Sequence, residues 1–159
     1  QRIKDGLETI DNGIGIHTGL VMMATVGNDN RLSTTVYSDA VNTAARLESL
    51  TKEVGASILI SEEVIEALEE EDRADLPAIC LGTTKVKGKD KPVRIYQYFA
   101  HESPALLQLK MQHANQFENI AELLDSDDHK QAQYHLALLE QLFPNDSILL
   151  AFRRKMKVG

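Results

Sequence analysis

The stretch after Tyr37 constrains the fold most, because it has the pattern of an amphipathic helix that carries one polar pair. Apolar residues recur there at spacings of three and four, which predicts one buried helical face. These residues are Ala40, Ala44, Leu47 and Val54. Asn42 and Arg46 stand at i and i+4, so their side chains leave successive turns in the same direction. We predict a helix that packs on a sheet and presents an amide and a guanidinium outward.

Both ends of this helix carry the expected signals. Ser38 or Asp39 can act as the N-cap and accept a hydrogen bond from a backbone N–H of the first turn. Gly55 stands where a helix commonly stops, since glycine adopts the left-handed conformation of a C-terminal cap at low cost. The helix is therefore expected to end just before Gly55.

Short strand patterns surround the helix, and this alternation of strands and helices predicts an α/β layer. Leu20 to Val26 is apolar at nearly every position, which predicts a strand covered on both faces, with Met22 and Met23 in the core. The other expected strands are Gly13 to Thr18, Ser33 to Tyr37, Ser57 to Ile60, Leu76 to Val86 and Pro92 to Phe99. A second helix is expected over Ser61 to Asp72, with acidic residues in its first turn.

From Ser103 onward the pattern is helical throughout, and the chain divides at this change into residues 1–100 and 101–159. Ser103 and Pro104 have the order of an N-cap followed by proline in the first turn. Apolar stripes and a break at Pro144 predict three helices. Their order is similar to one tetratricopeptide unit, which cannot bury its own apolar stripe. The tail should therefore pack on the first region or on a protein partner.

Five motifs in order resemble those of the class III nucleotidyl cyclases, the adenylyl and guanylyl cyclases. They are Gly15-Ile16-His17-Thr18-Gly19, Val26-Gly27, the helix motif Val36 to Glu48, Val86-Lys87-Gly88 and the strand Pro92 to Phe99. The resemblance implies a ferredoxin-like α+β sheet with helices on one side. Because the family's catalytic domain begins well upstream of these motifs, the sheet is expected to be incomplete at its N-terminus. Residues 1–100 would be the C-terminal half of the domain, and residues 101–159 an all-helical extension.

The resemblance implies part of an adenylate cyclase, which converts ATP into 3′,5′-cyclic AMP and pyrophosphate for intracellular signal transduction. Arg46 would stabilise the transition state, because a guanidinium matches phosphate oxygens and stays charged. Asn42 would orient the ribose. The implied substrate-binding residues are Thr35, Val36, Tyr37 and Lys87. Thr35 stands at the purine-contacting position, as in bacterial adenylyl cyclases, and Lys87 would hold the terminal phosphates as a point charge.

The resemblance also implies two Mg²⁺ or Mn²⁺ ions, whose ligands are aspartates of the family's upstream half. No metal ligand is therefore assigned in this chain. The family's active site forms between two subunits, which implies a homodimer that binds ATP. The chain alone, without the metal-binding half, is expected to be inactive.

Composition excludes several other classes of protein. A net charge of −7 on 159 residues disfavours nucleic acid, because phosphate binding needs a basic surface. One cysteine, Cys80, cannot form an internal disulfide, which fits a reducing cytoplasm. No apolar run reaches the roughly 18 residues of a membrane span, so no membrane contact is expected within the chain.

Two residues depart from the family pattern, since Ser38 and Ala24 stand where glycines are usual. They place catalysis in question, because a glycine with positive φ is not freely replaced. Two alternatives stay open, namely a non-catalytic cyclase-homology module that binds a protein partner, and a guanylate cyclase. His17 and Cys80 are interpreted as structural residues.

Overall fold

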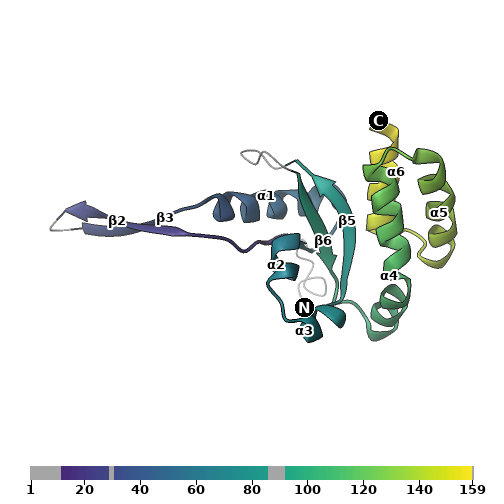
Figure 1. The fold of residues 1–159 in the computed structure, drawn as a ribbon, viewed down its shortest axis with the longest axis horizontal. Helices are drawn as coiled ribbons and strands as arrows, with labels where there is room; N and C mark the ends of the chain where they lie inside the picture. The colour runs from purple at the N-terminus through teal and green to yellow at the C-terminus, as the bar shows by residue number, and fades with distance from the viewer. Residues whose placement is uncertain (1–11, 29–30, 86–91, 159) are drawn as a thin grey trace, which may run out of the picture.

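The computed structural model describes residues 12–28, 31–85 and 92–158 (Figure 1). The strands in chain order are β1 (Ile14–Ile16), β2 (Met22–Asn28), β3 (Arg31–Tyr37), β4 (Ile58–Ser61), β5 (Ala78–Thr84) and β6 (Val93–Tyr98). The helices are α1 (Asp39–Val54), α2 (Glu62–Glu66), α3 (Glu70–Ala74), α4 (Pro104–Asp125), α5 (His129–Leu142) and α6 (Ser147–Val158). Strands and helices mix along the first region and helices alone follow, which confirms the predicted fold class.

The described strands form a four-stranded sheet in the order β1-β4-β6-β5 and a separate ribbon of β2 and β3. β1 pairs with β4 in parallel, and α1 provides part of the crossover that a parallel pair requires. β6 pairs antiparallel with both β4 and β5. The β2–β3 ribbon extends far from the sheet in Figure 1.

The prediction that the strand starting near Leu20 is covered on both faces is wrong. Met22 and Met23 are 75% and 73% exposed, and Leu20 before the strand is 97% exposed. The strand is bonded to β3 alone, and the described residues that could cover its apolar side chains lie elsewhere in the fold. An apolar run identifies a strand but does not say which surface will cover it.

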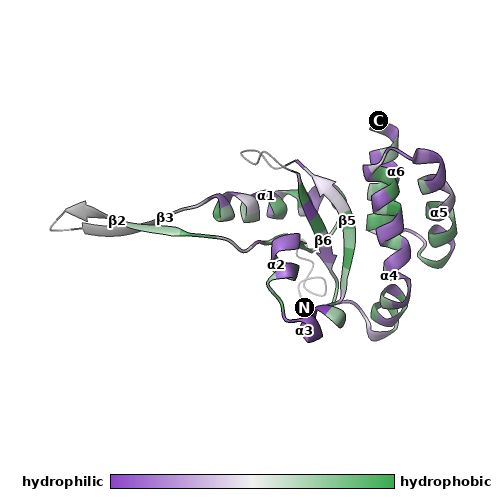
Figure 2. Cartoon of the chain, viewed as in Figure 1, coloured by the Kyte–Doolittle hydropathy of each residue, from purple (hydrophilic) through white to green (hydrophobic). Residues whose placement is uncertain are grey.

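The single helix expected over Ser61 to Asp72 is also wrong, because α2 and α3 are separate short helices. Ser61 does not cap α2, since its hydroxyl lies 2.7 Å from Nδ1 of His17. The guanidinium of Arg73 donates to the carbonyl oxygens of Glu66 and Leu68 at 3.0 and 3.1 Å, which stabilises the break between the helices. Neither helix buries a residue, and Figure 2 shows both as largely hydrophilic.

The helical tail packs on the sheet, as the sequence predicted for one of its two options. Side chains from α1, from the sheet and from α4, α5 and α6 belong to one continuous apolar core. Its fully buried members include Leu47, Leu59, Ile79, Phe99, Phe117, Ile120, Leu136 and Ile148. In Figures 1 and 2, α4 runs beside β5 with α6 close to it and α5 on the outside.

Polar contacts also join α4 to the sheet. The guanidinium of Arg94 on β6 donates to Glu118 and Glu122 of α4 at 2.9 and 3.3 Å. Asp125, the last residue of α4, accepts the backbone N–H of Thr83 at 2.8 Å. Gly82 permits this approach, because its φ is +84° and an added Cβ would lie 2.9 Å from the Asp125 carboxylate.

A buried ion cluster ties three segments of the second region together. Lys110 of α4 is 2% exposed, and its ammonium contacts Glu102 at 2.8 Å and Asp146 at 2.9 Å. The ammonium also lies 5.7 Å from the centre of the Phe99 ring. Asp146 in turn accepts the N–H of Ile148 at 2.9 Å at the start of α6. A charge at such depth is tolerated because it is paired.

Membrane insertion finds no support in the helices. Within the described ranges none of them combines the length and the apolar character that a membrane-spanning helix needs.

The shared core predicts that the tail stabilises the whole chain. Phe117→Ala should lower the free energy of unfolding by about 3–5 kcal/mol, because a fully buried phenylalanine would leave a cavity between the tail and the sheet. Leu138→Ala on α5 is the matched control, since Leu138 is 46% exposed and its loss should change stability by roughly 0.5 kcal/mol. Urea denaturation followed by circular dichroism would measure both, and equal effects would contradict the shared core.

Candidate active site

The candidate site lies on α1, whose two ends are fixed as the sequence predicted. Ser38 is the N-cap, and its hydroxyl oxygen accepts the N–H of Ala40 at 2.9 Å. The same hydroxyl donates to the carbonyl oxygen of Leu20 at 2.5 Å, which holds the start of α1 against the chain before β2. Gly55 ends the helix with φ +74°, in the left-handed conformation.

The replacement of the usual glycine by Ser38 leaves this cap intact. Ser38 has φ −167° and ψ 142°, which is extended backbone that any residue adopts. The objection that a positive φ would be lost therefore does not apply to this position.

A pair of glycines on one face of the first strand region seats α1 against the sheet. A Cβ added to Gly15 would lie 2.2 Å from the carbonyl oxygen of Ala44 and 2.3 Å from the N of Glu48, both backbone atoms of α1. A Cβ added to Gly13 would lie 1.8 Å from the hydroxyl oxygen of Thr51. The strand and the helix thus touch backbone to backbone, and sequence reasoning noted these glycines only as part of a motif. Their i, i+2 spacing on one strand face was the available signal.

The buried face of α1 differs in detail from the prediction. Ala40 and Leu47 are buried as expected, whereas Ala44 and Val54 are only half-buried. Thr43 and Thr51 are buried instead, at 1% and 2% exposure. Their hydroxyls donate to the carbonyl oxygens of Asp39 and Glu48 in the same helix, which satisfies them internally.

The structure places Asn42 and Arg46 as the sequence predicted, one turn apart and both exposed. Neither side chain forms a hydrogen bond or ion pair with another residue in the described ranges. An exposed amide and an exposed guanidinium, carried by a helix that the glycines hold firmly, form a recognition surface for a group outside the described chain. Five fixed donors in the guanidinium suit an anionic oxygen ligand.

The other candidate residues lie on both sides of this helix in the sequence. Thr35, Val36 and Tyr37 end β3, which leads through Ser38 directly into α1, and Val36 is 42% exposed. The strand therefore delivers them beside the N-terminal end of the helix. Lys87 lies outside the described residues.

Metal binding and histidine chemistry find little material here. Within residues 12–28, 31–85 and 92–158, no group of three carboxylate, histidine or cysteine side chains is arranged to hold a metal ion. His17 is 2% exposed and lies 2.7 Å from the Ser61 hydroxyl and 3.6 Å from the Glu63 carboxylate. It joins β1 to the end of β4, which confirms its structural role.

Cys80 is buried on β5 as expected and has the electrostatics of an unreactive thiol. Burial raises the pKa of the Cys80 thiol above its usual value, because desolvation penalises the thiolate. The Gly82 N–H and the Arg94 guanidinium both contact its sulfur and act in the opposite direction, at 3.4 and 3.1 Å. Desolvation is the larger effect, so the thiol stays protonated at neutral pH.

The backbone contact at Gly15 gives a test of how α1 is held. Gly15→Ala should destabilise the chain by about 1–3 kcal/mol, because the methyl group would overlap backbone atoms that cannot rotate away. Gly19→Ala is the matched control in the same motif. There the added Cβ would approach only the Ala40 side chain, at 3.1 Å, and the cost should be roughly 0.5 kcal/mol. Thermal denaturation would compare the two, and a smaller loss at Gly15 than at Gly19 would refute the seating contact.

Comparisons with known proteins agree with this geometry. The model of the family described as "Adenylate and Guanylate cyclase catalytic domain" matches residues 2–102. An adenylate cyclase of Anabaena cylindrica is 48% identical over 94 residues, which cover 59% of this chain and 18% of that protein. A terminal-differentiation specific adenylate cyclase of Dictyostelium discoideum is 31% identical over 144 residues, which cover 91% of this chain and 7% of that protein.

Solved structures of adenylyl cyclases are also similar over part of the chain. A bacterial light-regulated adenylyl cyclase is 27% identical with a TM-score of 0.46, covering 63% of this chain and 28% of that one. An adenylyl cyclase from P. aeruginosa is 33% identical with a TM-score of 0.43, covering 56% and 41%. The chain spans less than a fifth of the length of the two curated relatives above. Because the family model covers well over half of its residues, the chain belongs to the adenylate and guanylate cyclase catalytic domain family.

Proposed function

We propose that this chain is part of an adenylate cyclase, which converts ATP into 3′,5′-cyclic AMP and pyrophosphate for signal transduction in the cytoplasm. The observation that carries the proposal is the exposed, unpaired couple of Asn42 and Arg46 on a helix whose backbone touches the sheet. The names of the Anabaena and Dictyostelium relatives support adenylate rather than guanylate cyclase chemistry.

Arg46 would act on the phosphoryl group during cyclisation. In this reaction the ribose 3′-hydroxyl attacks the α-phosphate in line and expels pyrophosphate, so negative charge builds on the phosphoryl oxygens. A guanidinium that has no other described partner is free to bind these oxygens with two parallel hydrogen bonds. Its position on a fixed helix means that little reorganisation is needed as the charge develops.

Asn42 would orient the ribose next to Arg46. An amide both donates and accepts hydrogen bonds, so it can bind the ribose ring oxygen or a hydroxyl group. Since Asn42 and Arg46 leave successive turns of α1, an attacking ribose and its α-phosphate can contact the two side chains together.

The nucleotide base and the terminal phosphates would contact the neighbouring segments. We propose Thr35, Val36 and Tyr37 at the end of β3 as the base-binding residues, because this strand leads directly into α1. A threonine hydroxyl can both donate to and accept from a purine edge. Lys87 would hold the terminal phosphates, by its position in the motif before β6.

The two divalent ions of the proposed reaction, Mg²⁺ or Mn²⁺, do not fit the described residues, which hold no group of three metal-ligating side chains. Their ligands would therefore come from another part of the catalytic unit. The described chain would supply the ribose and phosphoryl contacts only.

A second cyclase subunit would complete the site, in a homodimer. The support lies in apolar side chains that nothing in the described ranges covers. Met22 and Met23 on the ribbon are about three-quarters exposed, and Ile14 and Ile16 on β1 are 49% and 42% exposed. Ile14 and Ile16 alternate with Gly15, so they face away from α1. Exposed apolar surface of this kind is typical of a protein interface.

Removing the guanidinium should slow the reaction while leaving the dimer intact. In the parent protein with its upstream residues, Arg46→Ala should lower kcat for cyclic AMP formation by about 100-fold or more, as the loss of a transition-state contact does. Asn42→Ala should also lower kcat, and the double variant should be inactive. Product formation from ATP and from GTP would be measured separately with Mn²⁺, beside sedimentation analysis of the dimer.

Lys52→Ala is the matched control, since Lys52 is an exposed cation in the last turn of the same helix. It should leave kcat unchanged. Cyclic GMP from GTP in place of cyclic AMP would support a guanylate cyclase. A folded dimer that makes neither product would contradict catalysis and favour a binding module.

The isolated chain should have no activity, because its described residues offer no metal-binding group. Purified residues 1–159 incubated with ATP and Mn²⁺ should yield no cyclic AMP above the background set by the Arg46→Ala variant. Formation that depends on Arg46 would show that the chain needs no further segment.

A further inference from the structure

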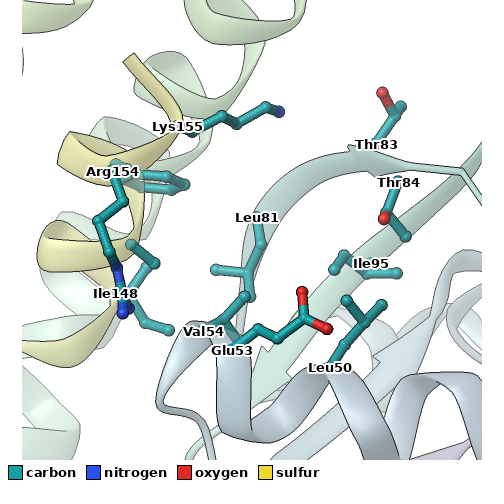
Figure 3. A pocket seen from close by; sticks show the side chains of 12 residues that line it. Leu50, Glu53, Val54, Leu81, Thr83, Thr84, Ile95, Ile148, Arg154 and Lys155 are labelled. Atoms are coloured by element: carbon teal, nitrogen blue, oxygen red, sulfur yellow. The ribbon is translucent and has the colours of Figure 1, made fainter. Parts of the chain in front are cut away.

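A pocket lies at the seam where α6 of the helical tail meets α1 and the sheet, away from Asn42 and Arg46. Its volume is about 300 Å³, and residues of α1, β5, β6 and α6 line it. Figure 3 shows side chains from these elements surrounding the space. Cavities of this size, between two parts of a protein, are where small molecules commonly bind.

The interior of the pocket is apolar. Leu50 of α1, Leu81 of β5, Ile95 of β6, and Ile148 and Phe152 of α6 line it, and all are at most 7% exposed. Such a surface accepts an aliphatic side chain, because contact removes apolar area of both partners from water.

The rim of the pocket carries one uncompensated charge of each sign. Glu53 of α1 and Arg154 of α6 both line it, and neither forms an ion pair with any residue in the described ranges, including each other. Lys155 also lines the pocket, but its ammonium is 2.7 Å from the Asp125 carboxylate and is thereby neutralised. The hydroxyls of Thr83 and Thr84 add neutral polar groups on the strand side.

We propose that this pocket binds a free apolar α-amino acid, of the size and shape of leucine, as its zwitterion. The ammonium group faces Glu53, the carboxylate group faces Arg154, and the aliphatic side chain contacts the apolar interior. A fatty acid or an alkyl amine would match only one of the two rim charges and would leave the other partly desolvated without a partner. A zwitterion with an apolar side chain matches both charges and the interior.

A ligand in this position contacts α1 and α6 together. Because it binds the folded seam and not the unfolded chain, it should raise the melting temperature of the chain in proportion to its saturation. This readout does not require cyclase activity, so it stands whether or not the proposed reaction does.

Calorimetric titration of residues 1–159 with four compounds tests the ligand class. L-leucine should bind about 10-fold more tightly than N-acetyl-L-leucine, which lacks the ammonium, and than L-leucinamide, which lacks the carboxylate, since each charged hydrogen bond contributes of that order. Glycine, which has both charges and no side chain, should bind more weakly than L-leucine. Absence of L-leucine binding, or equal affinity for all four compounds, would overturn the proposal.

Two variants assign the rim charges through ratios of affinity, which a general loss of structure cannot imitate. Glu53→Gln should remove the preference for L-leucine over N-acetyl-L-leucine and keep its preference over L-leucinamide. Arg154→Gln should do the reverse. Lys157→Gln is the control, because Lys157 is an exposed cation of α6 that does not line this pocket. It should change neither ratio.

Ala151→Phe gives an independent test, because Ala151 lines the pocket and a phenylalanine there would occupy it. This variant should keep its circular dichroism spectrum and lose L-leucine binding and the rise in melting temperature. Binding that persists in a folded Ala151→Phe chain, or ratios that Glu53→Gln and Arg154→Gln leave unchanged, would place the ligand elsewhere and refute the site.

Discussion

The contact between the backbone of the first strand and the backbone of α1 is the constraint on which the rest of the structure depends. Only glycine at position 15 allows the strand to approach Ala44 and Glu48 so closely. That approach orients the helix with Thr43, Leu47 and Leu50 toward the core and Asn42 and Arg46 toward solvent. The polar pair thus owes its exposure to a position on a different element, about thirty residues earlier in the chain.

Local signals in the sequence were sufficient for much of this fold and of the candidate site. Ser38 and Gly55 bound α1 as predicted, and helical periodicity alone was enough to place Asn42 and Arg46 on one exposed face. Caps and periodicity act over a few residues, so one sequence carries all the information that they need. The tail helices followed for the same reason, with Ser103 as the cap of α4.

Predictions that depended on a distant surface were the ones that failed. Met22 and Met23 are apolar and were expected in the core, but no part of the described chain covers their ribbon. Ser61 was expected to cap a helix, yet its hydroxyl meets His17 from another strand. The pocket between α1 and α6 likewise joins residues about one hundred positions apart, and neither Glu53 nor Arg154 has a motif that would have identified it. Such features depend on tertiary packing, which local patterns do not record.

The ion cluster around Lys110 has a consequence for how the chain comes apart. Separating α4 from α6 would leave a buried ammonium facing the Phe99 ring without one of its two carboxylates. Removing one partner of a buried ion pair costs about 3–5 kcal/mol, so partial detachment of the tail has a high free energy. States in which the tail is loose while the sheet stays folded are then rarely populated, and the two regions of the sequence behave as a single cooperative unit.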